Sequence, residues 1–199
     1  MVWIKRLFFI VIFLIGIAFL AFWMVASSPV PMYEGEKQLP GLKGDVNVTF
    51  DDFGIPHIHG ENAEDVYRSL GYVMASERLF QMELLRRVGT GRLSEVLGQP
   101  ALKADLFFRA SGISAYAQHS WNEFKASASD EAKKECQAFI EGINSFINEG
   151  SAPLEFTLAG IEMTPFEGSD LYAIAGYMAY SFSIAIKTDI LANELARQH

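Results

Sequence analysis

The chain has 199 residues, a formal net charge of −8 at pH 7 and a single cysteine, Cys136. The acidic balance argues against nucleic acid, polyphosphate ligands and anionic lipid surfaces as partners, because binding to them relies on clustered Lys and Arg. One cysteine excludes an intrachain disulfide, and its place in the apolar stripe of a helix favours a buried core thiol over a catalytic one.

Residues 1–28 are typical of a membrane anchor or a signal. An apolar run from Leu7 to Ala26 follows Lys5 and Arg6, and as a helix it would be roughly 30 Å long, which matches the hydrocarbon thickness of a bilayer. Because a secretory signal usually has a shorter apolar core, we favour an uncleaved inner-membrane anchor over a removed signal. The basic pair predicts a cytoplasmic N-terminus and a periplasmic location for the rest of the chain.

The exported part is more acidic than the whole chain. Setting Lys5 and Arg6 aside leaves 14 of the 16 basic residues against 24 acidic ones, a formal charge of −10. A neutral or apolar small molecule therefore suits this part better than an anionic polymer.

A connector and a β-hairpin are expected next. Residues 29–44 are rich in Pro, Gly and charge and have no helical periodicity, which is typical of an irregular connector. Over residues 46–50 apolar and polar side chains alternate, as in a half-buried strand. The sequence Asp-Asp-Phe-Gly at 51–54 then predicts a turn into a second extended segment, 55–59.

Six helical segments are expected beyond the hairpin. Asn62, Ser129 and Gly150 supply start and stop signals for two of them. The expected segments are 62–87, a short helix ending at Leu97, 100–109, 129–148, 169–179 and about 185 to 199, with a loop containing Pro153 and Pro165. The predicted fold class is α+β, predominantly helical with an N-terminal β-hairpin. Its unpaired sheet edge and unmatched apolar helix faces indicate a fragment or subunit rather than a whole domain.

The sequence contains no self-contained catalytic motif of the common kinds. There is no G-x-S-x-G and no H-E-x-x-H, and the segment 89–91, Gly-Thr-Gly, lacks the third glycine and the preceding strand of a phosphate loop. His57 and His59 lie two apart on an extended segment. With no third ligand nearby, solvated or hydrogen-bonded histidines are favoured over a zinc site.

The stretch from Asp51 to Gly98 resembles the N-terminal signature of the penicillin acylase family. It carries a D-x-x-G-I-P-H-I hairpin, a helix with G-Y-V-x-A and R-L-F-Q-M, and then G-R-L-S-E. One departure is Ser76-Glu77, where members commonly have Gln-Asp. Further similar features follow downstream: Asp105 with Arg109, residues 153–156 and residues 176–179. By this resemblance, residues 45–199 are identified as the small-subunit portion of a penicillin-acylase-like domain, incomplete at its C-terminus.

The resemblance implies the αββα sandwich of hydrolases that use an N-terminal nucleophile, completed by a large catalytic subunit from the same precursor. There the new N-terminal serine of the large subunit attacks the amide, and its own α-amine can serve as the base. The implied enzyme hydrolyses linear amides of the penicillin, cephalosporin or acyl-homoserine lactone type, with the nucleophile beyond His199. The rival interpretation is a truncated, non-catalytic, membrane-tethered binding or scaffold module.

The substrate-binding positions that the resemblance implies are Met178, Ser181 and Phe182. Met178 and Phe182 are four residues apart, so they share a helix face suited to an apolar acyl chain or phenyl ring; core packing is the alternative. Penicillin G acylases carry an Arg where this chain has Ser181. That difference shifts the expected substrate toward acyl-homoserine lactones or other acyl amides.

We also predict a calcium ligand and a group of structural polar residues. The resemblance implies one calcium ligand, for which Asp189 is the nearest candidate; calcium takes 6 to 8 oxygens, so the others would come from the missing subunit. An exposed helix residue is the alternative for Asp189. Glu77, Arg78 and Gln81 interrupt an apolar helical stripe, so we expect them to face the core and to form structural ion pairs rather than substrate contacts.

Overall fold

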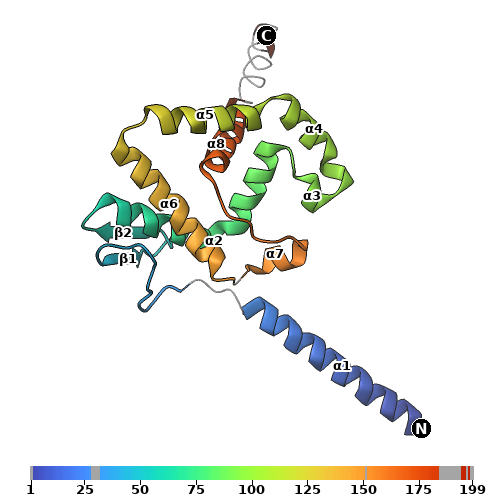
Figure 1. Ribbon diagram of the computed structural model, residues 1–199. Helices are drawn as coiled ribbons and strands as arrows, with labels where there is room; N and C mark the ends of the chain where they lie inside the picture. The colour runs from blue at the N-terminus through green and yellow to red at the C-terminus, as the bar shows by residue number, and fades with distance from the viewer. Residues whose placement is uncertain (1, 28–31, 151, 184–193, 196, 198–199) are drawn as a thin grey trace.

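The computed structural model describes residues 2–27, 32–150, 152–183, 194–195 and 197. Within these ranges the fold is predominantly helical and contains one two-stranded antiparallel sheet, which confirms the predicted balance of elements. Figure 1 shows the hairpin at one end of a body of packed helices, with the first helix extending away from it.

The first helix, α1, spans Val2–Ser27. Its segment Lys5–Trp23 has a mean hydropathy of 2.5 and is long and apolar enough to cross a membrane, with none of it buried against the rest of the chain. A signal sequence near the N-terminus can meet the same criteria of length and composition. The choice between an anchor and a removed signal therefore stays a prediction.

The hairpin consists of β1, Val46–Phe50, and β2, Pro56–Gly60, with Val48 opposite Ile58. The turn forms because Asp51 Oδ1 accepts hydrogen bonds from the backbone N–H groups of Phe53 and Ile55, both at 2.9 Å. The prediction is confirmed, with the second strand shifted by one residue. His57 lies 3.3 Å from the carboxylate of Asp51, in keeping with a hydrogen-bonded strand histidine.

Helix α2, Ala63–Thr90, is capped by Asn62 and ends at Gly91, which has the left-handed backbone that glycine adopts most readily. The backbone leaves helical geometry at Arg78, where φ is −141° and ψ is 20°, so α2 is kinked there. After α2 come α3, Ser94–Leu97, a 3-10 turn η1, Gln99–Ala101, and α4, Leu102–Ala110. These agree with the expected short helix and the segment at 100–109.

The expectation for Glu77, Arg78 and Gln81 was wrong, because all three side chains are exposed. The buried face of α2 runs about one residue earlier along the helix, a rotation of about 100° at 3.6 residues per turn. It contains small and polar residues that hydropathy places outside: Asp65, Ser69, Gly71 and Ala75, followed by Leu79 and Met82.

Two helices were not predicted. Helix α5, Ile113–Ser127, fills a stretch that the sequence analysis left unassigned, and α7, Leu154–Ala159, lies inside the segment expected to be a loop. Helix α6, Asp130–Asn148, was predicted within one residue, and Ser129 Oγ accepts the N–H of Ala132 at 3.2 Å.

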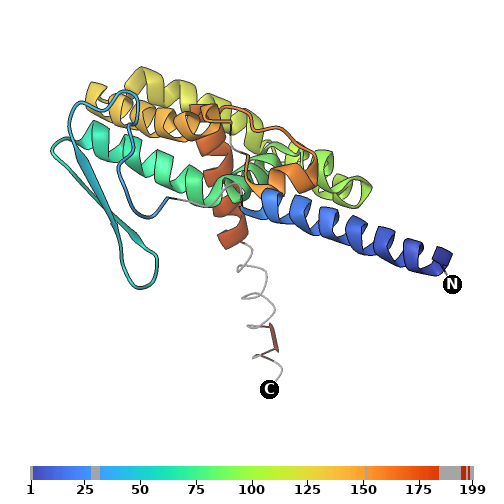
Figure 2. The same cartoon turned by 90° about the horizontal axis from the view of Figure 1, so that it is seen from below.

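The last described helix, α8, spans Gly168–Ser183 and is longer than the predicted 169–179. The helix predicted from about residue 185 lies almost wholly outside the described residues. Figure 2 shows α8 crossing behind α2 and α6 and extending beyond them at its C-terminal end.

The core lies where α2 and α6 pack against each other and against α7, α8 and the loop between them. Its buried members include Leu79, Ile143, Phe146, Phe156 and Phe166. Cys136 is only half-buried and free, so the prediction of a fully buried thiol was wrong in degree. Burial raises the pKa of this thiol, which disfavours the reactive thiolate.

Candidate functional site

The C-terminal half of α8 places the three predicted substrate-binding residues on the surface. Met178 is 43% exposed and Phe182 is 74% exposed, so neither packs in the core of the described chain. Ser181 is also exposed, but its hydroxyl donates to the carbonyl oxygen of Met178 at 2.8 Å. The outward surface of α8 is therefore mainly apolar at this end.

Aromatic contacts hold the other side of the same helix segment. The ring of Tyr177 lies 5.5 Å from that of Phe108 in α4, and the ring of Tyr180 lies 5.4 Å from both Phe107 and Phe108. The two pairs with Phe108 are edge-to-face and the pair of Phe107 with Tyr180 is tilted; edge-to-face pairs at such distances add to the stabilisation from burial. Because this side of α8 is held against α4, Met178 and Phe182 are turned away from it.

The described chain offers binding groups at this end of α8, but no assembled bond-breaking machinery. The hydroxyls of Ser181 and Ser183 both donate to carbonyl oxygens of their own helix, at 2.8 and 2.7 Å. An activated nucleophile needs a base within hydrogen-bond reach, and none of the described contacts supplies one to these hydroxyls. The arrangement is suited to holding an apolar group.

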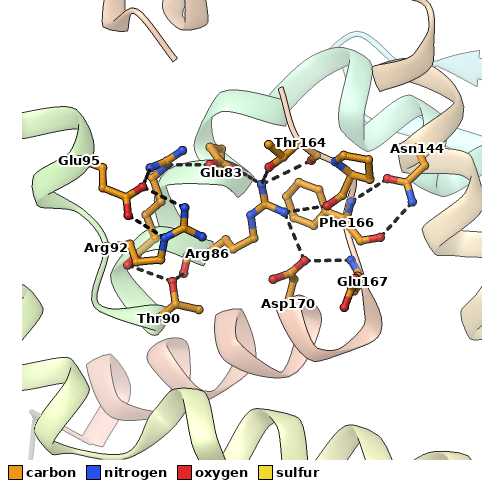
Figure 3. Close-up of polar contacts among 12 residues, drawn as sticks. Glu83, Arg86, Thr90, Arg92, Glu95, Asn144, Thr164, Phe166, Glu167 and Asp170 are labelled. Atoms are coloured by element: carbon orange, nitrogen blue, oxygen red, sulfur yellow. Dashed lines mark hydrogen bonds and ion pairs between the residues drawn. The ribbon is translucent and has the colours of Figure 1, made fainter. Parts of the chain in front are cut away.

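The N-terminal end of α8 is joined to α2 through the guanidinium group of Arg86 (Figure 3). Its Nη1 donates to the carbonyl oxygen of Pro165 at 3.0 Å and to Asp170 Oδ2 at 3.2 Å. Its Nη2 donates to the hydroxyl of Thr164 and to the carboxylate of Glu83. The guanidinium carbon also lies 4.2 Å from the centre of the Phe166 ring, within cation–π range.

Glu83 shares its carboxylate between two neighbouring arginines of α2. Arg86 and Arg87 are each 6% exposed, and Arg87 Nε donates to Glu83 Oε1 at 2.6 Å. Arg87 also donates to Glu95 of α3, which in turn accepts from Arg92 at 2.9 Å. The hydrogen bond from Arg92 is the main cause that lowers the pKa of the Glu95 carboxyl.

Two buried carboxylates fix loops around this framework. Asp105 accepts the backbone N–H groups of Leu93 and Ser94 at 2.7 and 2.8 Å. Asp65 accepts those of Lys43 and Gly44 at 3.1 and 3.0 Å. Burial raises the pKa of each carboxyl, but the hydrogen bonds it accepts outweigh burial and hold both pKa values below their ordinary range.

Within the described ranges, no group of three or more His, Cys, Asp and Glu side chains is arranged to hold a metal ion. The predicted calcium ligand, Asp189, lies outside those ranges. The calcium prediction is therefore untested by this structure.

Sequence reasoning did not single out Glu83, Arg86 or Arg87. The sequence did contain a pattern that indicates ion pairing: Arg86 and Arg87 follow Glu83 by three and four residues, so all three lie on one face of the helix. On an exposed helix the same pattern is a common solvated pairing, so spacing alone does not reveal burial.

Comparison with known proteins gives consistent relatives. Residues 45–199 match the family model for penicillin amidase. The chain is 40% identical over 142 residues to penicillin acylase 2 proenzyme of Pseudomonas sp. strain SE83, covering 71% of this chain and 18% of that protein. It is 30% identical over 174 residues to acyl-homoserine lactone acylase QuiP of Pseudomonas putida, covering 86% of this chain and 21% of that protein.

A solved structure is similar as well. A thermostable penicillin G acylase from Alcaligenes faecalis matches with a TM-score of 0.60 and 26% identity, over 78% of this chain and 84% of the matched chain. The chain spans about a fifth of the length of the curated relatives it matches.

Proposed function

The chain belongs to the penicillin amidase family, and from this premise we propose that it forms the small-subunit part of an acylase that hydrolyses linear acyl amides. In this role it supplies one wall of the acyl pocket. The bond-breaking groups come from the polypeptide segment that follows it.

The observation that carries this proposal is the exposure of Met178 and Phe182 at the outer end of α8. A contiguous exposed apolar surface is typical of a ligand-binding site or an interface. They are four residues apart and share one face, so a single acyl chain or ring can contact both. The similar proteins are named as acylases, which supports an acyl group as the ligand of this surface.

The chemistry follows from the family resemblance. An N-terminal serine of the large subunit attacks the amide carbon, its α-amine takes the hydroxyl proton, and the acyl group passes to the serine as the amine leaves. Water then releases the carboxylic acid. Backbone and Asn donors of the large subunit stabilise the oxyanion in both steps.

Ser181 restricts the range of substrates that we expect the pocket to accept. Penicillin G acylases carry an Arg at this position, whereas Ser181 is short, uncharged and hydrogen-bonded to its own helix. A β-lactam carboxylate would find no cation at this point. We therefore propose acyl-homoserine lactones or other uncharged acyl amides as the preferred substrates.

Two accessory features complete the proposal. Asp189 contributes one oxygen to a calcium site whose other ligands come from the large subunit. Helix α1 anchors the enzyme in the inner membrane with the catalytic domain on the periplasmic face.

Photoaffinity labelling tests the pocket directly. The complete gene product is incubated with a photoreactive acyl amide that carries a diazirine in its acyl chain, and labelled peptides are identified by mass spectrometry. Labelling within residues 178–182 that an unreactive acyl amide suppresses is the expected result. Labelling confined to other segments would refute the pocket assignment and favour the rival scaffold role.

A further inference from the structure

The guanidinium group of Arg86 joins α2 to two neighbouring segments that lie 78 to 84 residues further along the sequence. It belongs to α2, it donates to Thr164 and Pro165 in the loop before α8, and it reaches Asp170 in the first turn of α8. Asp170 Oδ2 also accepts the backbone N–H of Glu167 at 2.8 Å. The side chain of Arg86 therefore links the start of α8 to α2 by polar contacts, as Figure 3 shows, next to the close backbone approach of Gly89 in α2 to Ala173 in α8.

Because this contact lies at the start of α8, a small change in the direction of the helix there displaces its far end. Phe182 lies twelve residues after Asp170, which corresponds to roughly 18 Å along an α-helix. A tilt of about 10° at the start of α8 would move Phe182 by about 3 Å over that length. A displacement of this size changes the shape of a pocket, and misplacement of about 1 Å is enough to slow an enzymatic reaction severely.

We propose that Arg86 is a positioning residue, which sets the direction of α8 and thereby determines which acyl groups the pocket accepts. The inference rests on the proposed acylase function. Arg86 touches neither Met178 nor Phe182 in the described contacts, so it acts through the helix and not on the substrate. The planar fork of its guanidinium suits this task, because it binds several acceptors in fixed directions.

Arg87 provides a matched control. It is as buried as Arg86 and shares the carboxylate of Glu83, but its other partner is Glu95 in α3. Its described hydrogen bonds do not reach α8. A general loss of stability should therefore follow from changing either arginine, whereas a change in α8 should follow only from changing Arg86.

The test compares Arg86→Lys and Arg87→Lys in the complete gene product. Lysine keeps the charge but loses the fork. The kcat/KM values are measured for acyl amides of short, medium and long acyl chains, together with the melting temperature. We expect both variants to melt earlier. We expect the ratio of kcat/KM between long and short chains to change by about tenfold or more in Arg86→Lys and by less than about twofold in Arg87→Lys.

A second variant and a second measurement keep the inference falsifiable if Arg86→Lys does not fold. Asp170→Asn removes the charge on the α8 side and leaves the size of the side chain unchanged. Amide hydrogen exchange of residues 171–183 is then compared among Asp170→Asn, Arg87→Lys and the unchanged protein. Faster exchange in α8 for Asp170→Asn alone is expected. Equal exchange in all three, or an equal shift in acyl preference for both arginine variants, would overturn the inference.

The two proposals fail in different ways. An unchanged gene product that hydrolyses no acyl amide would refute the acylase function. The hydrogen-exchange comparison needs no substrate and would still decide whether Asp170, the α8 partner of Arg86, holds α8 in place.

Discussion

Gly71 of α2 lies directly against the backbone of Phe139 in α6, where a Cβ atom would come within 2.0 Å of the Phe139 carbonyl oxygen. The relationship is reciprocal, because a Cβ atom at Gly142 of α6 would lie 2.0 Å from the carbonyl oxygen of Arg68 in α2. The two helix backbones are thus in contact at this crossing.

Gly142→Ala should destabilise the protein strongly. The new methyl group meets backbone atoms, which cannot move aside as the end of a flexible side chain can, so the helices must separate. We expect the free energy of unfolding to fall by about 3 kcal/mol, the upper end of typical overpacking costs, or by more. Denaturant titration of the complete gene product measures it. Gln137→Ala, at an exposed position of the same helix, should change it by less than about 0.5 kcal/mol.

Glu83→Gln should be more damaging than Glu95→Gln. Glu83 is buried and its charge is shared by Arg86 and Arg87, so its loss leaves two buried guanidinium groups without their common anion. Breaking such a network costs about 3–5 kcal/mol. The side chain of Glu95 is 45% exposed, and an exposed pair contributes about 0–1 kcal/mol. Similar losses of stability in the two variants would contradict the assignment of Glu83 as the shared partner that stabilises Arg86 and Arg87.

Acid should weaken the fold through Asp105. Its pKa in the folded protein lies below the ordinary value of about 3.9. Protonation is therefore harder in the folded than in the unfolded chain, and the stabilisation present above about pH 4 is lost as the pH falls through the folded pKa. Asp105→Asn should cost about 1–3 kcal/mol at pH 7, because the N–H groups of Leu93 and Ser94 lose a charged acceptor.

The measurement for Asp105 is the free energy of unfolding between pH 7 and pH 2.5. The difference between Asp105→Asn and the unchanged protein should shrink as the pH falls. The exposed Asp52, changed to Asn, serves as the control. A difference that stays constant over the whole range would mean that the carboxylate charge of Asp105 does not stabilise the fold.

The hairpin, α6 and most of α2 could be predicted because their signals are local. Asp51 binds N–H groups two and four residues ahead, and Ser129 caps the helix that begins beside it. Such contacts involve only residues that are close in the sequence, so they can be recognised from the sequence alone. The spacing of four residues also placed Met178 and Phe182 on one face of α8, and their role in substrate binding stays a prediction.

The buried side of α2 could not be predicted because it depends on distant partners. Asp65 is buried since it binds the backbone of Lys43 and Gly44, and Gly71 is buried since it admits the backbone of α6. Hydropathy assigns both residues to the surface. Helix α5 was missed because its inward positions include the small Ala117, which gives little periodic signal. Its aromatic residues, such as Trp121, meet Tyr172 of α8 only in the folded chain.

Phe182→Ala should alter substrate choice without harming the fold. Its side chain is mostly exposed, so truncation removes little buried surface from this chain. In the complete enzyme we expect the kcat/KM for long or aromatic acyl groups to fall by about tenfold relative to short ones. Phe156→Ala is the matched contrast, because Phe156 is only 1% exposed and its loss should cost about 3–5 kcal/mol.

The yield of soluble protein distinguishes the proposed substrate-binding role of Phe182 from the core-packing role of Phe156. Phe182→Ala should be produced as well as the unchanged protein, whereas Phe156→Ala should be depleted. Equal depletion of both variants, together with a uniform loss of every activity, would assign Phe182 to packing instead of substrate binding.

The most direct test of the account is the release of free amine from an acyl-homoserine lactone and from a phenylacetyl amide. The assay compares the complete gene product with residues 45–199 alone. We predict hydrolysis by the complete product and none by residues 45–199, because the proposed function assigns the attacking serine to the large subunit. Turnover by residues 45–199 alone, or no turnover by the complete product, would contradict the account.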